Sequence, residues 1–426
     1  MQHVVAIFQR LGYQVTTNES VEWDVLWAHH YPFDALVKKL KPNQRVSKFP
    51  GSGFVTQKVE LATSGGLGIP PAFRLPNDKQ MFLKYAEANP EAQFVLKNNY
   101  HGSIRLKSIG EIDLDSKGSF LQRFISNPFL IDGRKFEIGV SVVVTSIDPL
   151  RIYKIVGDVT FRFCKDLYEG LNASNPNQYV IRDEFIPAFD APALKKYLDL
   201  NFSLQDSFEA HLRNLGVDPK LIWAQIDEQI VSAYLNRESV LATLLSRYGH
   251  KRSFFEFVRF EFMLDSELKV HLMEAIMSPS LFSAKYPQKS IRYQQVFFTI
   301  LSLVGLASYV HPPHQNSTEA KDMIVAERNL MVFREICVLC KNCEKFECRL
   351  CAPCLAKNEE LMYDLKMAYK EHMNKFRSVR IFPPRMTRNQ AKLGIQSSFL
   401  NHRLTTKNML LARWFQGKCL KDDSWC

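Results

Sequence analysis

The clearest hydrophobic pattern in the chain lies in two neighbouring segments, Phe257–Leu264 and Leu268–Ala275. Both are rich in apolar, β-branched and aromatic residues. The intervening Asp265-Ser266-Glu267 supplies turn-forming side chains, so the pattern predicts a β-hairpin. Each segment also contains one carboxylate, Glu261 on the first and Glu274 on the second. Because an isolated ionised carboxylate is costly inside a sheet, such groups usually hold a cation or a basic side chain.

The register of this hairpin decides what its two carboxylates can do. A loop of two or four residues would pair Glu261 with Leu272 and leave Glu274 diagonally next to it on the same face. A loop of three residues would put the carboxylates on opposite faces. On one face they would form a Mg²⁺ site of the kind that holds nucleotide phosphates. The alternative is two solvated glutamates on an edge hairpin.

Further strand patterns lie upstream. Phe94-Val95-Leu96 ends at Lys97 and is followed by a flexible loop that contains Gly102. An ammonium group at the end of a strand, beside the backbone N–H groups of such a loop, suits the binding of phosphate oxygens. Leu121–Ile125 and Lys135–Thr145 are predicted strands separated by turns.

Helical spacing is found mainly in the second half of the chain. It predicts helices over Ala193–Leu200, Ile222–Tyr248 and Leu355–Arg380, the last ended by Pro383-Pro384. The uncharged run Val296–Val310 is too short and too interrupted by Ser and Gly for a membrane span. We therefore expect a buried helix there and no membrane span.

Composition adds size and charge to this picture. The chain has 426 residues, 46% of them hydrophobic and 12% aromatic, which predicts two or three packed lobes. The net charge is +11, and residues 321–426 hold 20 Lys and Arg against 11 Asp and Glu. A basic C-terminal module implies an acidic partner: nucleic acid, an anionic membrane or an acidic polypeptide tail. A merely solvated helical surface is the alternative.

Six cysteines between residues 337 and 354 follow the pattern C-x₂-C-x₂-C-x₄-C-x₂-C-x₂-C. C-x₂-C pairs on both sides of a gap fit tetrahedral Zn²⁺. Six cysteines in a row also fit three disulfides in an oxidising compartment. So many cysteines within a short segment predict a crosslink, and their spacing leaves open whether it is a Zn²⁺ site or a set of disulfides. The cysteines are Cys337, Cys340, Cys343, Cys348, Cys351 and Cys354.

Several blocks of residues resemble the tubulin–tyrosine-ligase-like family of the ATP-grasp superfamily. FEFMLDSELKVHLMEAIMSPSL, which ends at Leu281, is similar to the family pattern G-F-D-hydrophobic-L-D-x-x-L-K-P-W-L-L-E-hydrophobic-N-x-S-P-S. FLQRFISNPFLIDGRKFEIG, which begins at Phe120, resembles V-Q-K-Y-I-x-x-P-L-L-I-x-G-R-K-F-D-L-R. RVSKFPGSGFVTQKVEL, from Arg45, is similar to N-H-F-P-G-x-x-x-hydrophobic-T-R-K-D-x-L. The resemblance spans roughly residues 20–285.

The resemblance implies an α+β fold of the ATP-grasp kind, with a nucleotide held between two α+β lobes. An N-terminal α/β lobe and a Cys-rich, mainly helical C-terminal extension would complete the chain. We expect the N-terminal lobe at residues 1–90, the central lobe at 91–180, the lobe with the metal hairpin at 181–315 and the basic extension at 316–426.

The same resemblance implies ATP and Mg²⁺ as cofactors and assigns candidate roles. The strand that precedes the first turn would line the adenine slot, and charged residues on the following strands would face the phosphates or the metal. An arginine among them offers a fork for a carboxylate or phosphate. The candidates are Lys97, Gly102, Gln122, Arg123, Phe124 and Ile125 for the nucleotide, Lys135, Glu137 and Arg162 for catalysis, and Glu261 and Glu274 for the metal.

The chain also departs from the family pattern. Gly139 stands where the family has an arginine, and Ile276 stands where it has a metal-holding asparagine. The family's L-T-N segment is missing after Tyr168. Glu137 and Glu261 replace aspartates but keep a carboxylate. Mg²⁺ commonly keeps several waters, so two glutamates and phosphate oxygens would still complete its coordination.

Two functions follow from these observations. The first is an ATP-dependent ligase that joins an amino acid, glutamate in our expectation, to glutamate side chains in the acidic C-terminal tails of tubulin, through an acyl-phosphate. The second is a catalytically impaired protein of the same fold that binds tubulin or another protein. We expect a monomer, no nucleic-acid partner, and a cytoplasmic, cytoskeleton-associated location. A secretory lumen is the alternative if the cysteines form disulfides.

Overall fold

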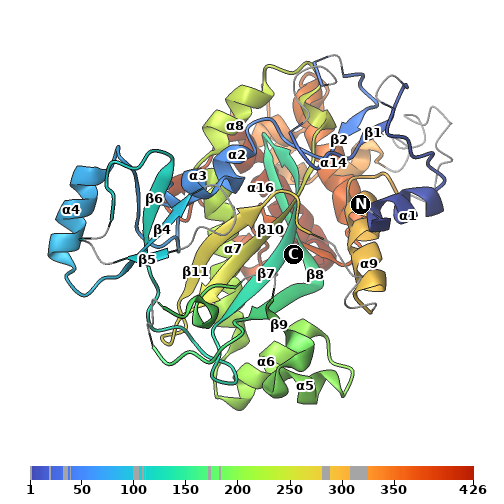
Figure 1. Ribbon diagram of the computed structural model, residues 1–426. Helices are drawn as coiled ribbons and strands as arrows, with labels where there is room; N and C mark the ends of the chain where they lie inside the picture. Colours follow the sequence, from blue (N-terminus) through green and yellow to red (C-terminus); the bar gives the residue numbers. More distant parts are fainter. Residues whose placement is uncertain are drawn as a thin grey trace.

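The computed structural model is a mixed α+β protein built around two β-sheets, a large one at the centre and a small one at the left in Figure 1. This confirms the α+β class. The described residues are 2–18, 21–31, 37–38, 40–98, 105–107, 110, 112–170, 174–181, 184–280, 288–307 and 325–426.

The large sheet has the strand order β11-β10-β7-β8-β12 within the described residues, and the short β9 pairs with β8 off this path. All of these neighbouring strands are antiparallel. The strands are β7 (Phe136–Ile147), β8 (Leu150–Phe163), β9 (Ile186–Pro187), β10 (Glu256–Leu264), β11 (Val270–Ile276) and β12 (Ser378–Phe382).

The central strand β7 is buried on both faces. Val142 and Val144 belong to the core on one side of the sheet, and Val143 belongs to a second core on the other side. Successive side chains of a strand point to opposite faces, so an unbroken run of valines fits a doubly covered strand. The first side is covered by α5 (Pro192–Leu198), α6 (Leu204–Asn214), α7 (Pro219–Leu235) and α8 (Glu238–Leu245), and the second by α1 (Gln2–Arg10) and α9 (Gln288–Leu303).

Two of the predicted helices differ in detail from the structure. The helix expected over Ile222–Tyr248 is two helices, because α7 ends at Leu235 and α8 begins at Glu238. The helix expected in Val296–Val310 is the second half of α9, and its apolar side chains are buried against the sheet. In the described part of the chain, no helix has the length and apolarity needed to cross a membrane.

The small sheet has the order β3-β6-β4-β5 and its own core. Phe82 of α4 (Lys79–Ala88) packs there against Phe73 and Phe94. The short helix α3 (Lys58–Ala62) contacts both β6 and β11, so it lies between the two sheets. The strands are β3 (Ala72–Arg74), β4 (Phe94–Asn98), β5 (Arg105–Lys107) and β6 (Ser119–Arg123); α2 (Gly53–Thr56) and the parallel pair β1 (Val25–Leu26) and β2 (Arg45–Val46) precede them.

The predicted hairpin is present as β10 and β11, but neither expected register is correct. Leu264 pairs with Val270 across a loop of five residues, and Glu261 pairs directly with Glu274. An odd loop alone would place the two carboxylates on opposite faces. The register shifts by one residue next to Glu261, so that Met273 is an extra residue between Leu272 and Glu274. This β-bulge returns Glu274 to the face of Glu261.

The C-terminal extension completes the large sheet. The helix predicted over Leu355–Arg380 is wrong at its end, since α14 (Glu359–Met373) stops seven residues earlier and Ser378–Phe382 forms β12 on the edge of β8. A positive φ of 49° at Arg377 makes the turn between them. The other elements of this region are α11 (Glu327–Leu330), α12 (Arg334–Val338), α13 (Ala352–Leu355), α15 (Arg388–Leu393), β13 (Ser398–Phe399), β14 (His402–Arg403) and α16 (Thr406–Lys421).

The cysteine cluster forms disulfides in the structure. Sequence spacing left zinc and disulfides open, and it gave no sign of a fourth disulfide at the end of the chain. Cys164 is a buried free cysteine. The pairs are Cys337–Cys351, Cys340–Cys348, Cys343–Cys354 and Cys419–Cys426.

A buried carboxyl in β10 should make the stability of the fold depend on pH. Glu256 is 1% exposed, and Ser52 donates a hydrogen bond to it. Burial raises its pKa from 4.5 to about 7, and Lys48 opposes the shift. Between pH 4.5 and 7 the folded protein therefore binds more protons here than the unfolded chain, so this group's contribution to stability falls as pH rises through that range.

We expect Glu256→Gln to remove this part of the pH dependence. The free energy of unfolding of the wild type should fall between pH 5 and pH 7.5 by about 1–3 kcal/mol more than that of the variant, since one pKa unit corresponds to about 1.4 kcal/mol. Equilibrium urea unfolding at the two pH values measures the difference. Equal falls in both proteins would contradict the burial argument.

Candidate active site

One face of the large sheet brings together three carboxylates from three adjacent strands. The register places Glu137 of β7 opposite Arg162 of β8, Gly139 of β7 opposite Glu261 of β10, and Glu261 opposite Glu274 of β11. Side chains two residues apart on a strand share a face, so Glu137 lies on the face of Glu261 and Glu274. The hydrogen-bonded register of the sheet thus places acids that are far apart in the sequence next to one another on one face.

Each of these acids contacts a cation. Arg162 Nη2 is 3.0 Å from Glu137 Oε2 and 3.2 Å from Glu261 Oε1. Arg259 Nε is 2.6 Å from the same Glu261 oxygen. Lys58 Nζ is 3.4 Å from Glu274 Oε1. The sheet face is therefore an alternating cluster of charges, which is how a fold accommodates ionised groups away from water.

The two hairpin carboxylates differ in accessibility. The side chain of Glu261 is 2% exposed, whereas that of Glu274 is 28% exposed. Two arginines hold Oε1 of Glu261, while its buried Oε2 has no hydrogen-bond partner among the described residues. A buried carboxylate oxygen without a partner is uncommon and costly. Glu261 is thus a rigidly held group with one free acceptor, and Glu274 is the more open group beside it.

Burial raises the pKa of Glu137, and the guanidinium of Arg162 opposes the rise. Burial lowers the pKa of Arg162, but the carboxylates of Glu261 and Glu137 outweigh it, and the net direction is upward. Arg162 consequently stays protonated at any physiological pH. The pair can orient a substrate carboxylate or phosphate, but Arg162 cannot act as a base.

Two of the predicted lysines lie close enough to this face to interact with its acids. Lys97, on β4 of the small sheet, donates to Gln122 Oε1 at 2.8 Å. Burial lowers its pKa to about 8, with a further contribution from Lys135. Lys135 is 5% exposed and donates to the backbone oxygen of Tyr179 at 2.9 Å. Burial lowers the pKa of Lys135 as well.

The predicted adenine strand is β6, which ends at Arg123. Gln122 is 1% exposed and its Nε2 has no partner among the described residues. Phe124 and Ile125 follow the strand and are buried, with Phe124 under the ammonium of Lys135 at 5.1 Å. Arg123 instead donates to the Tyr85 hydroxyl, away from the lysines. Gly102 lies outside the described residues.

The carboxylate face fits a magnesium ion that arrives with a nucleotide. In the described ranges, no group of three or more His, Cys, Asp or Glu is arranged to hold a metal. Mg²⁺, however, is usually bound by one or two carboxylates together with phosphate oxygens and water. Glu274 and the free Oε2 of Glu261 supply two such ligands. Ile276, at the end of β11, supplies none.

Sequence reasoning missed two residues of this cluster. Lys58 stands at the lysine of the T-R-K-D pattern, so the resemblance contained the signal for it. Arg259 stands at the glycine of the G-F-D pattern and was not singled out, because its importance depends on the neighbouring strand. The assigned roles of the other candidates stay predictions.

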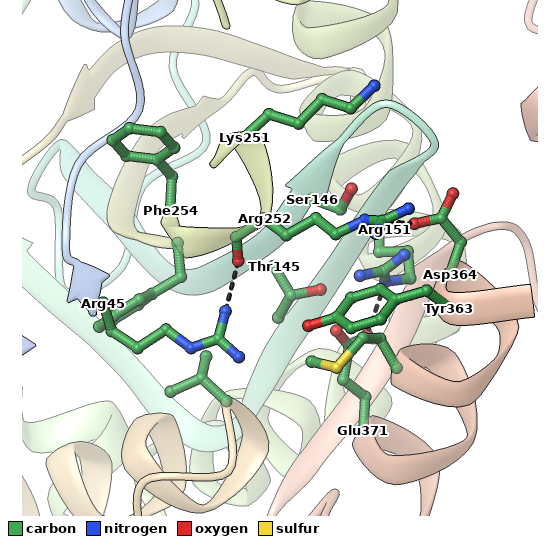
Figure 2. A pocket seen from close by; sticks show the side chains of 13 residues that line it. Arg45, Thr145, Ser146, Arg151, Lys251, Arg252, Phe254, Tyr363, Asp364 and Glu371 are labelled. Atoms are coloured by element: carbon green, nitrogen blue, oxygen red, sulfur yellow. Dashed lines mark hydrogen bonds and ion pairs between the residues drawn. The ribbon is translucent and has the colours of Figure 1, made fainter. Parts of the chain in front are cut away.

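A cavity at the far end of β7 is separate from this face. Figure 2 shows its side chains, and its volume is ≈ 440 Å³ including solvent at the mouth. Thr145 and Ser146 of the large sheet line one wall, and Tyr363 and Asp364 of α14 line another. Burial raises the pKa of Asp364 to about 6. This cavity marks the junction between the sheet and the C-terminal extension.

Comparison with known proteins gives one consistent result. The family model described as "Tubulin-tyrosine ligase family" matches residues 37–318. The chain is 36% identical over 445 residues to the probable tubulin polyglutamylase ttll-15 of Caenorhabditis elegans, and the match covers 100% of this chain and 84% of that protein.

More distant similarity extends to vertebrate proteins. The human tubulin monoglutamylase TTLL4 is 27% identical over 68% of this chain, and the match covers 25% of its own length. The mouse tubulin polyglutamylase TTLL5 is 23% identical over 97% of this chain, and 33% of its length is covered. The chain thus matches only about a quarter to a third of these longer proteins.

Proposed function

This chain belongs to the tubulin-tyrosine ligase family, and on that premise we propose that it is an ATP-dependent ligase that adds glutamate to glutamate side chains of tubulin C-terminal tails. The single observation that carries the proposal is the carboxylate pair of the hairpin, Glu261 and Glu274, on a sheet face that lies close to Lys97 of the small sheet. The relatives, which are named as tubulin polyglutamylases and a tubulin monoglutamylase, supply the substrate class.

The proposed reaction has two balanced steps. A carboxylate oxygen of a tail glutamate attacks the γ-phosphorus of ATP, and the bond to the departing ADP oxygen breaks. The α-amino nitrogen of free glutamate then attacks the acyl carbon, phosphate leaves, and the nitrogen gives up a proton. Mg²⁺ would neutralise charge on the phosphate oxygens during the first step. The product is an amide bond on the glutamate side chain.

The chain's own residues divide these tasks in our proposal. Lys97 and Lys135 bind anionic phosphate oxygens, and the strand end at Gln122 meets the adenine edge. Glu261 and Glu274 hold Mg²⁺. Arg162 orients the carboxylate or phosphate group that reacts, because its fixed charge and fork geometry suit such oxygens. The nucleotide would lie between the two sheets, as in the ATP-grasp arrangement.

The proposed partners follow from charge. The tubulin tail is acidic, and the extension carries most of the net positive charge of the chain. Part of that charge is used internally, since Lys407 pairs with Asp148 and Arg388 with Asp423. Attraction between unlike surfaces would raise the association rate and weaken with added salt.

We further propose a monomer that is associated with the cytoskeleton, because its substrate is there. The disulfides of residues 337–354 meet the condition stated above for a secretory location, since such bonds persist mainly in oxidising compartments. Our proposal for the location follows the substrate instead. The disulfides lie outside the carboxylate face, so the proposed chemistry does not depend on them.

The proposal is tested with the full chain, radiolabelled glutamate and Mg·ATP. We expect label to enter tubulin that carries its C-terminal tails and not tubulin from which a protease has removed the tails. Omission of ATP or addition of a chelator should abolish the labelling, and mass spectrometry should find glutamyl additions on tail glutamates. A folded protein that labels neither substrate, with glutamate or with other amino acids, would overturn the proposal in favour of a binding module.

A further inference from the structure

The space around Gly139 is filled by its neighbours. A Cβ atom built there would be 2.3 Å from Thr160 Oγ1, 2.9 Å from Glu261 Oε2 and 3.3 Å from Arg259 Cδ. Contacts under 3.0 Å force something to shift. The backbone of β7 therefore carries no side chain at this point, and side chains from β8 and β10 occupy the position that a Cβ atom of residue 139 would take.

The side chain of Arg259 reaches this place from the adjacent strand. Gly139 is opposite Glu261, and Arg259, two residues earlier on β10, is opposite Ser141. Arg259 and Glu261 share a face, and Nε of the arginine bonds the carboxylate at 2.6 Å. The guanidinium thus lies over the bare stretch of β7, beside the carboxylate that Arg162 also contacts at 3.2 Å.

The two positions are exchanged relative to the family pattern quoted above. That pattern has an arginine at the position of Gly139 and a glycine at the position of Arg259. Here the glycine and the arginine have changed places across two hydrogen-bonded strands, so the face keeps the same number of cations. A loss at one position without the gain at the other would change the net charge of a partly buried cluster.

We propose that Arg259 supplies, from β10, the positive charge that Gly139 leaves out, and that it acts as a positioning residue for Glu261. This inference rests on the proposed ligase function and deepens it at the same site. Arg162, Arg259 and Lys58 balance Glu137, Glu261 and Glu274. Without Arg259, this set of ion pairs has one cation fewer than acids, so the surroundings of an anionic nucleotide are less positive by one charge, and Glu261 loses one of its two arginine partners.

The test is a set of variants that removes the charge and then returns it at the other position. Arg259→Met should lower kcat by about 100-fold, the scale seen when one preorganised donor is removed, and Arg259→Lys should retain an intermediate rate. Arg259→Gly combined with Gly139→Arg should regain most of the lost rate. The exchange variant and its Arg259→Gly parent also carry Thr160→Ala, which removes the atom 2.3 Å from the Cβ position of residue 139. The protein with Thr160→Ala alone is the reference for these two variants.

Calorimetry with Mg·ATP gives a second reading that does not need tubulin. We expect about tenfold weaker binding for Arg259→Met and recovery in the exchange variant, since a charge-assisted contact is lost and regained. The wild type could bind Mg·ATP, and the variants could change the affinity as expected, while no tubulin is labelled. In that case the proposed substrate is wrong and the role of Arg259 stands. Circular dichroism and thermal unfolding establish that each variant is folded.

Two results would overturn the inference. One is a wild-type kcat and Mg·ATP affinity in Arg259→Met. The other is an exchange variant that is folded but no more active than Arg259→Gly in the same background. A merely structural arginine would lower the thermal midpoint together with the activity, and arginine at 139 would not restore the rate. If the exchange variant does not fold, the inference is decided by kcat alone. It stands if kcat falls from the wild type to Arg259→Lys and again to Arg259→Met, and it fails if kcat does not follow this order.

Discussion

Replacing Glu274 by glutamine should reduce kcat/KM for glutamate ligation by at least about 100-fold, because one of the two hairpin ligands for Mg²⁺ is removed. The change keeps the size of the side chain and its hydrogen-bonding ability, and removes only the charge. Glu274 is the more open of the two carboxylates, so the effect should be expressed in binding and rate and much less in stability. Calorimetry of Mg·ATP should show affinity lost together with activity.

Glu60→Gln is a matched control for this experiment. Glu60 lies on α3, two residues from Lys58, and its side chain is 26% exposed against 28% for Glu274. It also pairs with a cation, Arg74 at 2.8 Å. We expect a change of less than about threefold in kcat/KM, since Glu60 pairs with Arg74 and is not one of the proposed metal ligands. Equal losses in both variants, or wild-type affinity in Glu274→Gln, would remove the hairpin from the proposed mechanism.

Replacing Glu371 by alanine should destabilise the fold by about 3–5 kcal/mol, because it leaves the guanidinium of Arg151 buried without its partner. Arg151 Nε is 2.9 Å from Glu371 Oε2, and the two side chains are 4% and 2% exposed. The pair joins β8 to α14 beside the cavity of Figure 2. It therefore fastens the C-terminal extension to the sheet that carries the carboxylates.

Asp199→Ala provides the comparison at the surface. Lys195 and Asp199 form an ion pair at 2.6 Å with side chains 54% and 62% exposed, and we expect a cost below about 1 kcal/mol. Arg151→Met with Glu371→Leu should recover most of the loss, since a buried pair replaced by apolar groups is often close to neutral. Urea unfolding with the disulfides intact measures all of these. A loss in Glu371→Ala no greater than in Asp199→Ala would contradict the role of burial.

The carboxylate pair shows how far the sequence could lead. Alternation predicted a hairpin with Glu261 and Glu274, and the family resemblance indicated that they face one nucleotide. The register was wrong, because a single extra residue, Met273, reverses which face a strand residue takes. Apolar patterns determine that a strand forms, but the hydrogen bonds to the neighbouring strand determine which residue is the extra one.

The C-terminal region shows a second limit. Its apolar spacing predicted a helix as far as Arg380, but Ser378–Phe382 is a strand because β8 offers it an open edge. Tertiary context outweighs local propensity when a segment of five residues suits both structures. Likewise, cysteine spacing predicted a crosslink, whereas only the fold decided which sulfurs meet.

The sequence by itself determined the hairpin with its acids, the lysine near the end of a strand and the family resemblance, which in turn implied the α+β class. These features depend on short-range periodicity and on residues that keep their order along the chain. Only the tertiary structure decided that Arg259 stands over Gly139, that Glu137 joins the hairpin acids and that Glu371 fastens the extension. Each of these is a contact between residues distant in sequence, and sheet register and packing, which no local pattern encodes, determine such contacts.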